Sequence, residues 1–290
     1  MTNQGRTNFT LFYLKQYKRN CLLHCLVLTL FFSSQVNAQG DLLVTPRRVV
    51  LDGTKKSVEF NLANVGKDSA TYIVSFIQIR MSEDGTFEQI AQPDSGQQFA
   101  DRFLRIFPRT VTLAPNEAQS VKLQLVRTNE LASGEYRSHL YFRVQPNNKP
   151  LGEEDVKKDS GISVQLIPVF GISLPVIIRK GASTAQISLS QLSFNLHNDT
   201  IPSLKLTFNR TGNMSIYGDL SVNHIAPDGK KTQVGMVKGI SVYTPNNTRN
   251  FNLLLDITKK VNYHLGKLQI TYSDSSPQPV VYTENEITLL

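Results

Sequence analysis

Four histidines carry the acid–base and metal-binding potential of the chain beyond residue 38: His139, His197, His224 and His264. No two of them stand at the i,i+4 spacing of a zinc-binding helix. The chain also has no serine-hydrolase, phosphate-loop or dinucleotide-binding motif. We interpret these histidines as solvated or hydrogen-bonded strand residues. The residues therefore predict no enzyme, no bound metal and no small-molecule cofactor.

Aspartates and cysteines add no catalytic pattern. Three aspartates precede glycine, which is typical of turns rather than of general acids: Asp52, Asp84 and Asp228. Both cysteines, Cys21 and Cys25, lie within the first 38 residues. If that segment is removed, the rest of the chain has no thiol for a disulfide, a zinc site or a nucleophile.

The first 38 residues have the pattern of a secretory signal. Four basic residues and no acid precede an apolar run over residues 22–32, and the segment ends in Val36-Asn37-Ala38. This order matches the basic, apolar and small-residue regions of a cleaved signal peptide. A retained anchor helix is the alternative, although this almost uninterrupted run of 11 residues is well below the ~20 needed to cross a bilayer. We predict a cleaved signal peptide at 1–38 and export of the remaining chain.

Removing that segment changes the charge of the chain. It takes four of the 31 basic residues with it, so the net charge falls from +8 to +4. The basicity of the whole chain is therefore largely a targeting feature, and nucleic acid is not an expected partner. The remaining 252 residues, 290 minus 38, are long enough to bury a core without disulfides.

Alternating apolar and polar residues between closely spaced turns predict strands along the rest of the chain. The first group of strands is expected at 58–62, 71–80, 121–125 and 134–144, and a faint helical period covers 97–106. The pattern restarts after residue 181, with strands expected at 187–189, 204–208, 216–225, 233–242, 250–257, 266–272 and 280–289. We predict an all-β fold of two tandem immunoglobulin-like β-sandwich domains, at 39–181 and 182–290.

Residues 162–178 carry an unusually long apolar alternation. Every even position is apolar or proline: Ile162, Val164, Leu166, Pro168, Phe170, Ile172, Leu174, Val176 and Ile178. Seventeen residues at ~3.3 Å each would span about 56 Å, more than one sandwich covers. We expect the strand to overhang, with Ile162, Val164, Leu166 and Phe170 presented to a partner. The alternative is a strand broken at 168–171 that packs in its own domain.

Tyr136 follows Gly134-Glu135 at the start of an expected strand F. Immunoglobulin-like sandwiches place a corner tyrosine at this point, although an ordinary cross-strand aromatic would have the same pattern.

Three stretches carry a family resemblance. They are Pro46–Gly53 (PRRVVLDG), Leu104–Arg109 (LRIFPR) with the following Leu113–Leu123, and Gly134–Arg143 (GEYRSHLYFR) ahead of a strand that ends in Ile177-Ile178-Arg179. Together they resemble the periplasmic pilus chaperones, the PapD-like chaperone–usher family. The resemblance covers the first domain well, and the second only by size and strand count.

The resemblance implies a chaperone that lends an edge strand to pilus or fimbrial-type subunits and delivers them to an outer-membrane usher. Arg48 matches the family arginine that binds the subunit's C-terminal carboxylate, and Arg179 matches an arginine of an inter-domain salt bridge. Two positions depart from the family. Its second carboxylate-binding residue, a lysine, falls on Pro175, and the glutamate partner of Arg179 falls on Arg137, although Glu135 lies on the same strand face. An exported structural or adhesive tandem immunoglobulin-like protein is the alternative function.

Overall fold

The computed structural model describes residues 42–145, 169–198 and 200–289, and the fold is all-β, as predicted. The segment predicted to be a signal peptide, and Ile162, Val164, Leu166 and Pro168, lie outside the described residues. Two separate hydrophobic cores mark two β-sandwiches. No helix in the described part of the chain is long and apolar enough to span a membrane.

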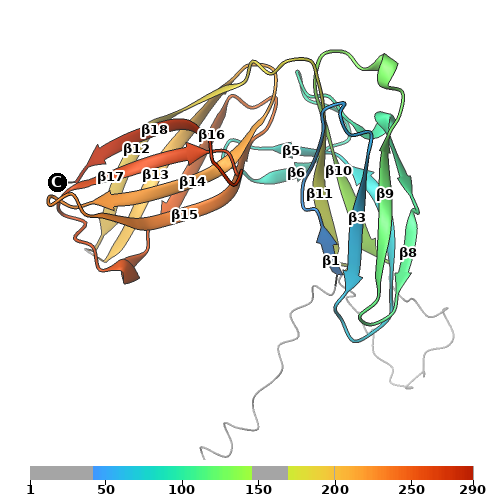
Figure 1. Ribbon diagram of the computed structural model, residues 1–290, viewed down its shortest axis with the longest axis horizontal. Helices are drawn as coiled ribbons and strands as arrows, with labels where there is room; N and C mark the ends of the chain where they lie inside the picture. The colour runs from blue at the N-terminus through green and yellow to red at the C-terminus, as the bar shows by residue number, and fades with distance from the viewer. Residues whose placement is uncertain (1–41, 146–168, 199, 290) are drawn as a thin grey trace, which may run out of the picture. The chain divides into compact units, whose positions relative to one another are not determined.

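The first sandwich packs two sheets against each other (Figure 1). One sheet has the order β1 (Leu42–Thr45), β3 (Ser57–Asn64), β9 (Ala118–Leu125), β7 (Leu104–Phe107). The other has the order β2 (Val49–Leu51), β11 (Gly171–Lys180), β10 (Gly134–Val144), β4 (Ala70–Ile77), β8 (Thr110–Leu113). The first sheet corresponds to strands A, B, E and D of an immunoglobulin-like domain. In the second sheet, β11, β10 and β4 correspond to strands G, F and C. The N-terminal segment therefore contributes to both sheets, through β1 and then β2.

The second sandwich follows the same plan in the yellow to red part of Figure 1. Its three-stranded sheet has the order β12 (Gln186–His197), β13 (Ile201–Thr211), β16 (Thr248–Leu254). Its four-stranded sheet has the order β15 (Lys231–Val242), β14 (Ile216–Ile225), β17 (Lys267–Ser273), β18 (Val281–Thr288). A short hairpin, β5 (Ile79–Met81) with β6 (Phe87–Gln89), completes the strands. Met81 joins the second core, and Asn246 Nδ2 donates to its carbonyl at 2.6 Å.

The structure bears on two local predictions, the turn at Asp52 and the corner role of Tyr136. Asp52 Oδ1 accepts hydrogen bonds from the Thr54 amide at 3.1 Å and hydroxyl at 2.6 Å, which is a turn role. Tyr136 is buried, and its hydroxyl accepts from the Ala132 amide at 3.0 Å. A bond from the first residues of strand F to the backbone a few residues upstream is the tyrosine-corner contact. The corner interpretation of Tyr136 is therefore the correct one.

The helical period over 97–106 was a wrong prediction. The segment makes only one 3-10 turn, Asp101–Phe103, and then enters β7. Its buried residues, including Ala100, Phe103 and Ile106, reach the core through that turn and through strand alternation. The Ser138 hydroxyl accepts hydrogen bonds from the amides of Ala100 and Asp101, so β10 fixes the turn. Two further 3-10 turns, Thr128–Glu130 and Ile257–Lys259, lie in loops.

Candidate functional site

The candidate site residues Arg48, Glu135 and Arg179 lie on or next to three adjacent strands of the first sandwich. Arg48 immediately precedes β2, Glu135 lies on β10 and Arg179 lies on β11. The register of the sheet places Glu135 directly opposite Arg179. Cross-strand neighbours have their Cβ atoms about 4.5–5.5 Å apart, so the pairing itself brings these two side chains together.

Glu135 is the most enclosed charged group of the site. Its side chain is 0% exposed, and its Oε2 atom lies 3.0 Å from Arg179 Nε. The same oxygen accepts from the Ser215 amide at 3.0 Å and from the Ser215 hydroxyl at 2.8 Å. Oε1 accepts from the Thr244 hydroxyl at 3.3 Å. A buried carboxylate needs such partners, and two of them come from the second sandwich.

Arg179 is held by the same group of residues. Besides its contact with Glu135, its Nη2 atom donates to the Ser215 carbonyl at 2.6 Å and to the Ser215 hydroxyl at 3.2 Å. Its side chain is 25% exposed. Arg179 and Glu135 thus form a hydrogen-bonded unit with Ser215 of the second sandwich.

Arg48 is arranged differently from Arg179. Its guanidinium carbon lies 4.4 Å from the centre of the Tyr217 ring, which is on β14. Its Nε atom is buried and has no hydrogen-bond partner among the described residues. A guanidinium has five N–H donors, and a buried donor without a partner is costly. Arg48 is therefore a half-buried cation with donors to spare, which is suited to binding an anion.

Tyr282, on β18, lies in the electrostatic field of both arginines. Burial is the main cause that raises the pKa of the Tyr282 hydroxyl, and the Asp274 carboxylate raises it further. The guanidinium groups of Arg179 and Arg48 partly offset that rise. Tyr282 is 42% exposed, and its neighbours Val280 and Val281 are 63% and 53% exposed. Tyr282 therefore lies within reach of the charge of Arg48, in a segment whose side chains are largely exposed.

The two positions that depart from the family pattern are both accounted for. Arg137 is buried on β10, and its guanidinium stacks at 4.1 Å on the Tyr243 ring. Its Nη2 atom donates to the Ile79 carbonyl at 3.2 Å, and burial lowers its pKa. Pro175 stands opposite His139 and supplies no charge. Lys180, the lysine on β11, is engaged with the Leu131 carbonyl at 2.7 Å.

One edge of β11 is open. On one side, all ten residues of β11 pair with β10. On the other side, β2 runs parallel to β11 and pairs only at Val176, Ile177 and Ile178. Within the described residues, no strand pairs with that side of Gly171–Pro175. Val49 is opposite Val176, so Arg48 stands where the open edge begins.

The described part of the long strand is β11, which begins at Gly171; the predicted stretch over 162–168 lies outside the described residues. Val169 and Phe170 stand just before β11, and the Phe170 carbonyl accepts from the Val144 amide at 3.1 Å. Leu174, Val176 and Ile178 belong to the first core, so the even face of this part is used within its own sandwich. Val169 and Phe170 are 44% and 48% exposed at the start of the strand. Phe170 is thus the candidate anchor that the described residues place at the surface.

Histidine environments differ from one another. His224 Nε2 lies 3.0 Å and 2.9 Å from the carbonyls of Asn262 and Leu265. His139 is 4% exposed, packs edge-on to Phe87 at 6.2 Å between centroids, and its buried Nδ1 atom has no partner in the described part of the chain. The expectation of a solvated or hydrogen-bonded residue therefore fails at His139. No group of three His, Cys, Asp or Glu in the described ranges is arranged to hold a metal.

Acid should destabilise the protein through His139. Burial, and secondly the Arg137 cation, lowers the pKa of His139 from 6.5 to about 3. Between these values the unfolded chain binds a proton that the folded chain does not, so stability falls as the pH falls below 6.5. We expect the free energy of unfolding to fall by about 2 kcal/mol between pH 7 and pH 5 because of His139. Urea unfolding of His139→Phe should show a correspondingly smaller pH dependence, and an unchanged one would contradict the assignment.

Sequence reasoning missed the contributions of the second sandwich. Ser215, Tyr217 and Thr244 complete the site, yet none stands in a motif or at a distinctive spacing. Their contacts with Glu135 span 80 residues of sequence for Ser215 and 109 for Thr244. The single available signal was the pair of buried charges on β10 and β11, which require partners from outside their own sheet.

Comparison with known proteins finds several solved structures of modest similarity. No family model and no curated protein matches the chain. Among solved structures, a chain of a chaperone–tip adhesin complex of CFA/I fimbriae has a TM-score of 0.42 at 11% identity, covering 87% of this chain and 99% of that one. The class 5 fimbriae chaperone CfaA has a TM-score of 0.41 at 14% identity, covering 86% and 99%. The Pseudomonas aeruginosa CupB2 chaperone has a TM-score of 0.40 at 13% identity, covering 86% and 100%. Similarity at this level carries no inference about function, which rests on the residues of the site.

Proposed function

We propose that this protein is a periplasmic assembly chaperone that binds pilus or fimbrial-type subunits along β11 and delivers them to an outer-membrane usher. The proposal rests on the resemblance of Pro46–Gly53, Leu104–Leu123 and Gly134–Arg143 to the PapD-like chaperones, and on the site itself. The observation that carries it is the open edge of Gly171–Pro175 ending at the unpartnered Nε of Arg48.

The geometry suggests how a subunit binds. β2 is parallel to β11 and starts at Val49. A subunit strand that ends just before Arg48 would continue the line of β2 along the open edge, with backbone hydrogen bonds to Gly171–Pro175. Its C-terminal carboxylate would then meet the spare donors of Arg48, a charge-assisted contact.

Arg48 would act without a second cation in this scheme. The family lysine is replaced by Pro175, Lys180 is bonded to the Leu131 carbonyl, and Arg179 is paired with Glu135. We therefore infer that one arginine binds the carboxylate and that apolar contacts bind the rest of the subunit strand. Phe170 and the residues predicted from sequence, Ile162, Val164 and Leu166, would supply those contacts to the subunit's groove.

Cell fractionation separates this function from that of an exported adhesive protein. We expect the tagged full-length protein to be recovered from the soluble periplasmic fraction, bound one-to-one to a subunit that mass spectrometry identifies. Native mass spectrometry measures the stoichiometry. Recovery on the cell exterior, or as a free protein under conditions in which pili assemble, would contradict the chaperone proposal and favour the adhesive one.

A further inference from the structure

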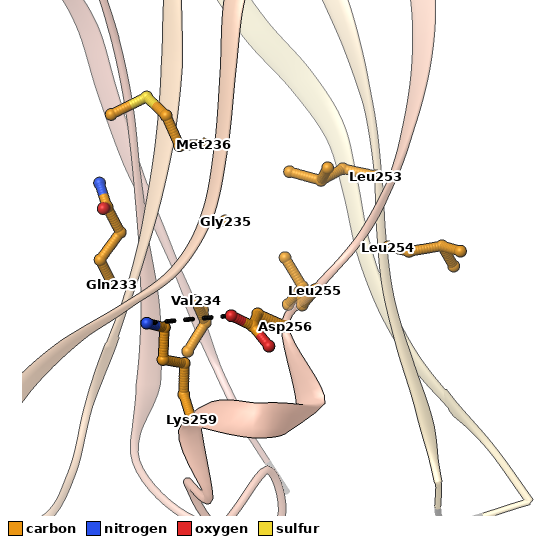
Figure 2. Close-up of a pocket in the computed structure, with 9 residues that line it drawn as sticks. All are labelled: Gln233, Val234, Gly235, Met236, Leu253, Leu254, Leu255, Asp256 and Lys259. Atoms are coloured by element: carbon orange, nitrogen blue, oxygen red, sulfur yellow. Dashed lines mark ion pairs between the residues drawn. The ribbon is translucent and has the colours of Figure 1, made fainter.

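The second sandwich has an open slot between its two sheets. β15 pairs only with β14, and β16 pairs only with β13, so each strand ends its sheet on this side of the sandwich. One backbone hydrogen bond joins the two rims, from the Asp256 amide to the Val234 carbonyl at 2.7 Å. Beside it lies a cavity of about 380 Å³, shown in Figure 2.

The walls of the slot are apolar, and a glycine in β15 lets leucine side chains approach its backbone closely. Leu253 and Leu255 point toward the β15 backbone, while Leu254 points away (Figure 2). A Cβ atom on Gly235 would come within 3.0 Å and 3.1 Å of the methyl groups of these two inward leucines. Glycine inside a strand commonly marks close approach by a ligand or another backbone. Met236, farther along the same rim, is 46% exposed.

The closed end of the slot is basic. Lys259 lines the slot, and with Lys230 and Lys260 it also lines a neighbouring hollow of about 200 Å³. Lys231 begins β15 and is exposed. Asp256 Oδ1 accepts hydrogen bonds from the Thr258 amide and hydroxyl at 2.8 Å and 2.6 Å. The Lys259 ammonium makes a long ion pair of 4.0 Å with Asp256 Oδ2. Among the described residues, the other three lysines make no ion pair.

We propose that this slot binds an extended segment of a partner protein that alternates apolar side chains and ends in acidic residues. The Asn250 amide of β16 donates to the Glu83 carbonyl at 2.6 Å, and the Val234 carbonyl accepts from Asp256. The remaining edge groups of β15 and β16 supply backbone hydrogen bonds to such a segment, and the leucine walls accept its alternate side chains. The four lysines select acidic residues at the Lys259 end by charge complementarity. This surface is separate from Arg48 and β11, so the inference goes beyond the proposed function and does not depend on it.

Two fluorescent nine-residue peptides test the proposal with the full-length protein. Both alternate valine and threonine, and one ends in two glutamates while the other ends in two lysines. By fluorescence anisotropy we expect the acidic peptide to bind about tenfold or more tightly than the basic one. Equal affinity for the two peptides, or no binding of either, would overturn the proposal.

Matched variants locate the binding. Lys259→Glu/Lys260→Glu should weaken binding of the acidic peptide about tenfold or more, whereas Lys55→Glu/Lys56→Glu, an exposed lysine pair of the first sandwich, should leave it unchanged. Gly235→Val should abolish binding by filling the slot, and the outward Leu254→Ser should not. The proposal fails if both lysine pairs behave alike. It also fails if sedimentation shows a dimer that Gly235→Val dissociates, since a second copy would then occupy the slot.

Discussion

Glu135→Ala should lower the free energy of unfolding by about 3 kcal/mol, the cost typical of breaking a buried ion pair by removing one partner. The Glu135 side chain is fully buried, and it accepts from Arg179, from the Ser215 amide and hydroxyl, and from Thr244. Removing it leaves the buried Ser215 amide without its acceptor and Arg137 without its nearest balancing carboxylate. The loss is expected in the contact between the two sandwiches as well as in the first core.

Urea titration measures this effect. The chain has no tryptophan, so circular dichroism or tyrosine fluorescence reports unfolding. Glu130→Ala, which removes an exposed glutamate of the same sandwich, should change the midpoint little. Glu135→Gln should lie between the two, because an amide keeps the size of the side chain and part of its acceptor capacity. A Glu135→Ala midpoint equal to that of Glu130→Ala would show that the buried pair is not a structural contact.

The sequence predicted the strands well because alternation is a local signal. The predicted 58–62, 134–144 and 216–225 lie within or match β3 (Ser57–Asn64), β10 (Gly134–Val144) and β14 (Ile216–Ile225). Local patterns fail where the outcome depends on a distant strand. The 97–106 segment has helical spacing, yet Ser138 on β10 fixes it as a single 3-10 turn.

The long apolar alternation lies only partly within the described residues. It continues back to Ile162, but residues 162–168 lie outside the described part of the chain, and Val169 and Phe170 stand just before β11. The family resemblance put the partner of Arg179 at Arg137, and alternation indicated only that Glu135 shares its strand face; the register of β10 and β11 places Glu135 opposite Arg179. Ser215, Tyr217 and Thr244 are contributed by the second sandwich, and no pattern in one sandwich specifies its contacts with another.

Arg48→Ala should reduce subunit capture by about tenfold or more while leaving the fold intact. A hydrogen bond to a charged group contributes about 1.5–3 kcal/mol, which corresponds to roughly a 10- to 150-fold change in affinity. Arg48 makes its described contact with the ring of Tyr217, and its Nε is without a partner among the described residues, so the variant loses little internal structure. Arg48→Lys should restore capture in part, since it keeps the charge and loses the planar donors.

Arg47 provides the matched control, because it is adjacent in sequence, equally charged and exposed. The decisive measurement is the amount of the mass-spectrometry-identified subunit that co-purifies from the periplasm with Arg48→Ala and with Arg47→Ala, at equal chaperone levels and with thermal midpoints checked. The carboxylate-binding role predicts near-normal recovery with Arg47→Ala and a loss of about tenfold or more with Arg48→Ala. Equal recovery with the two variants would contradict it.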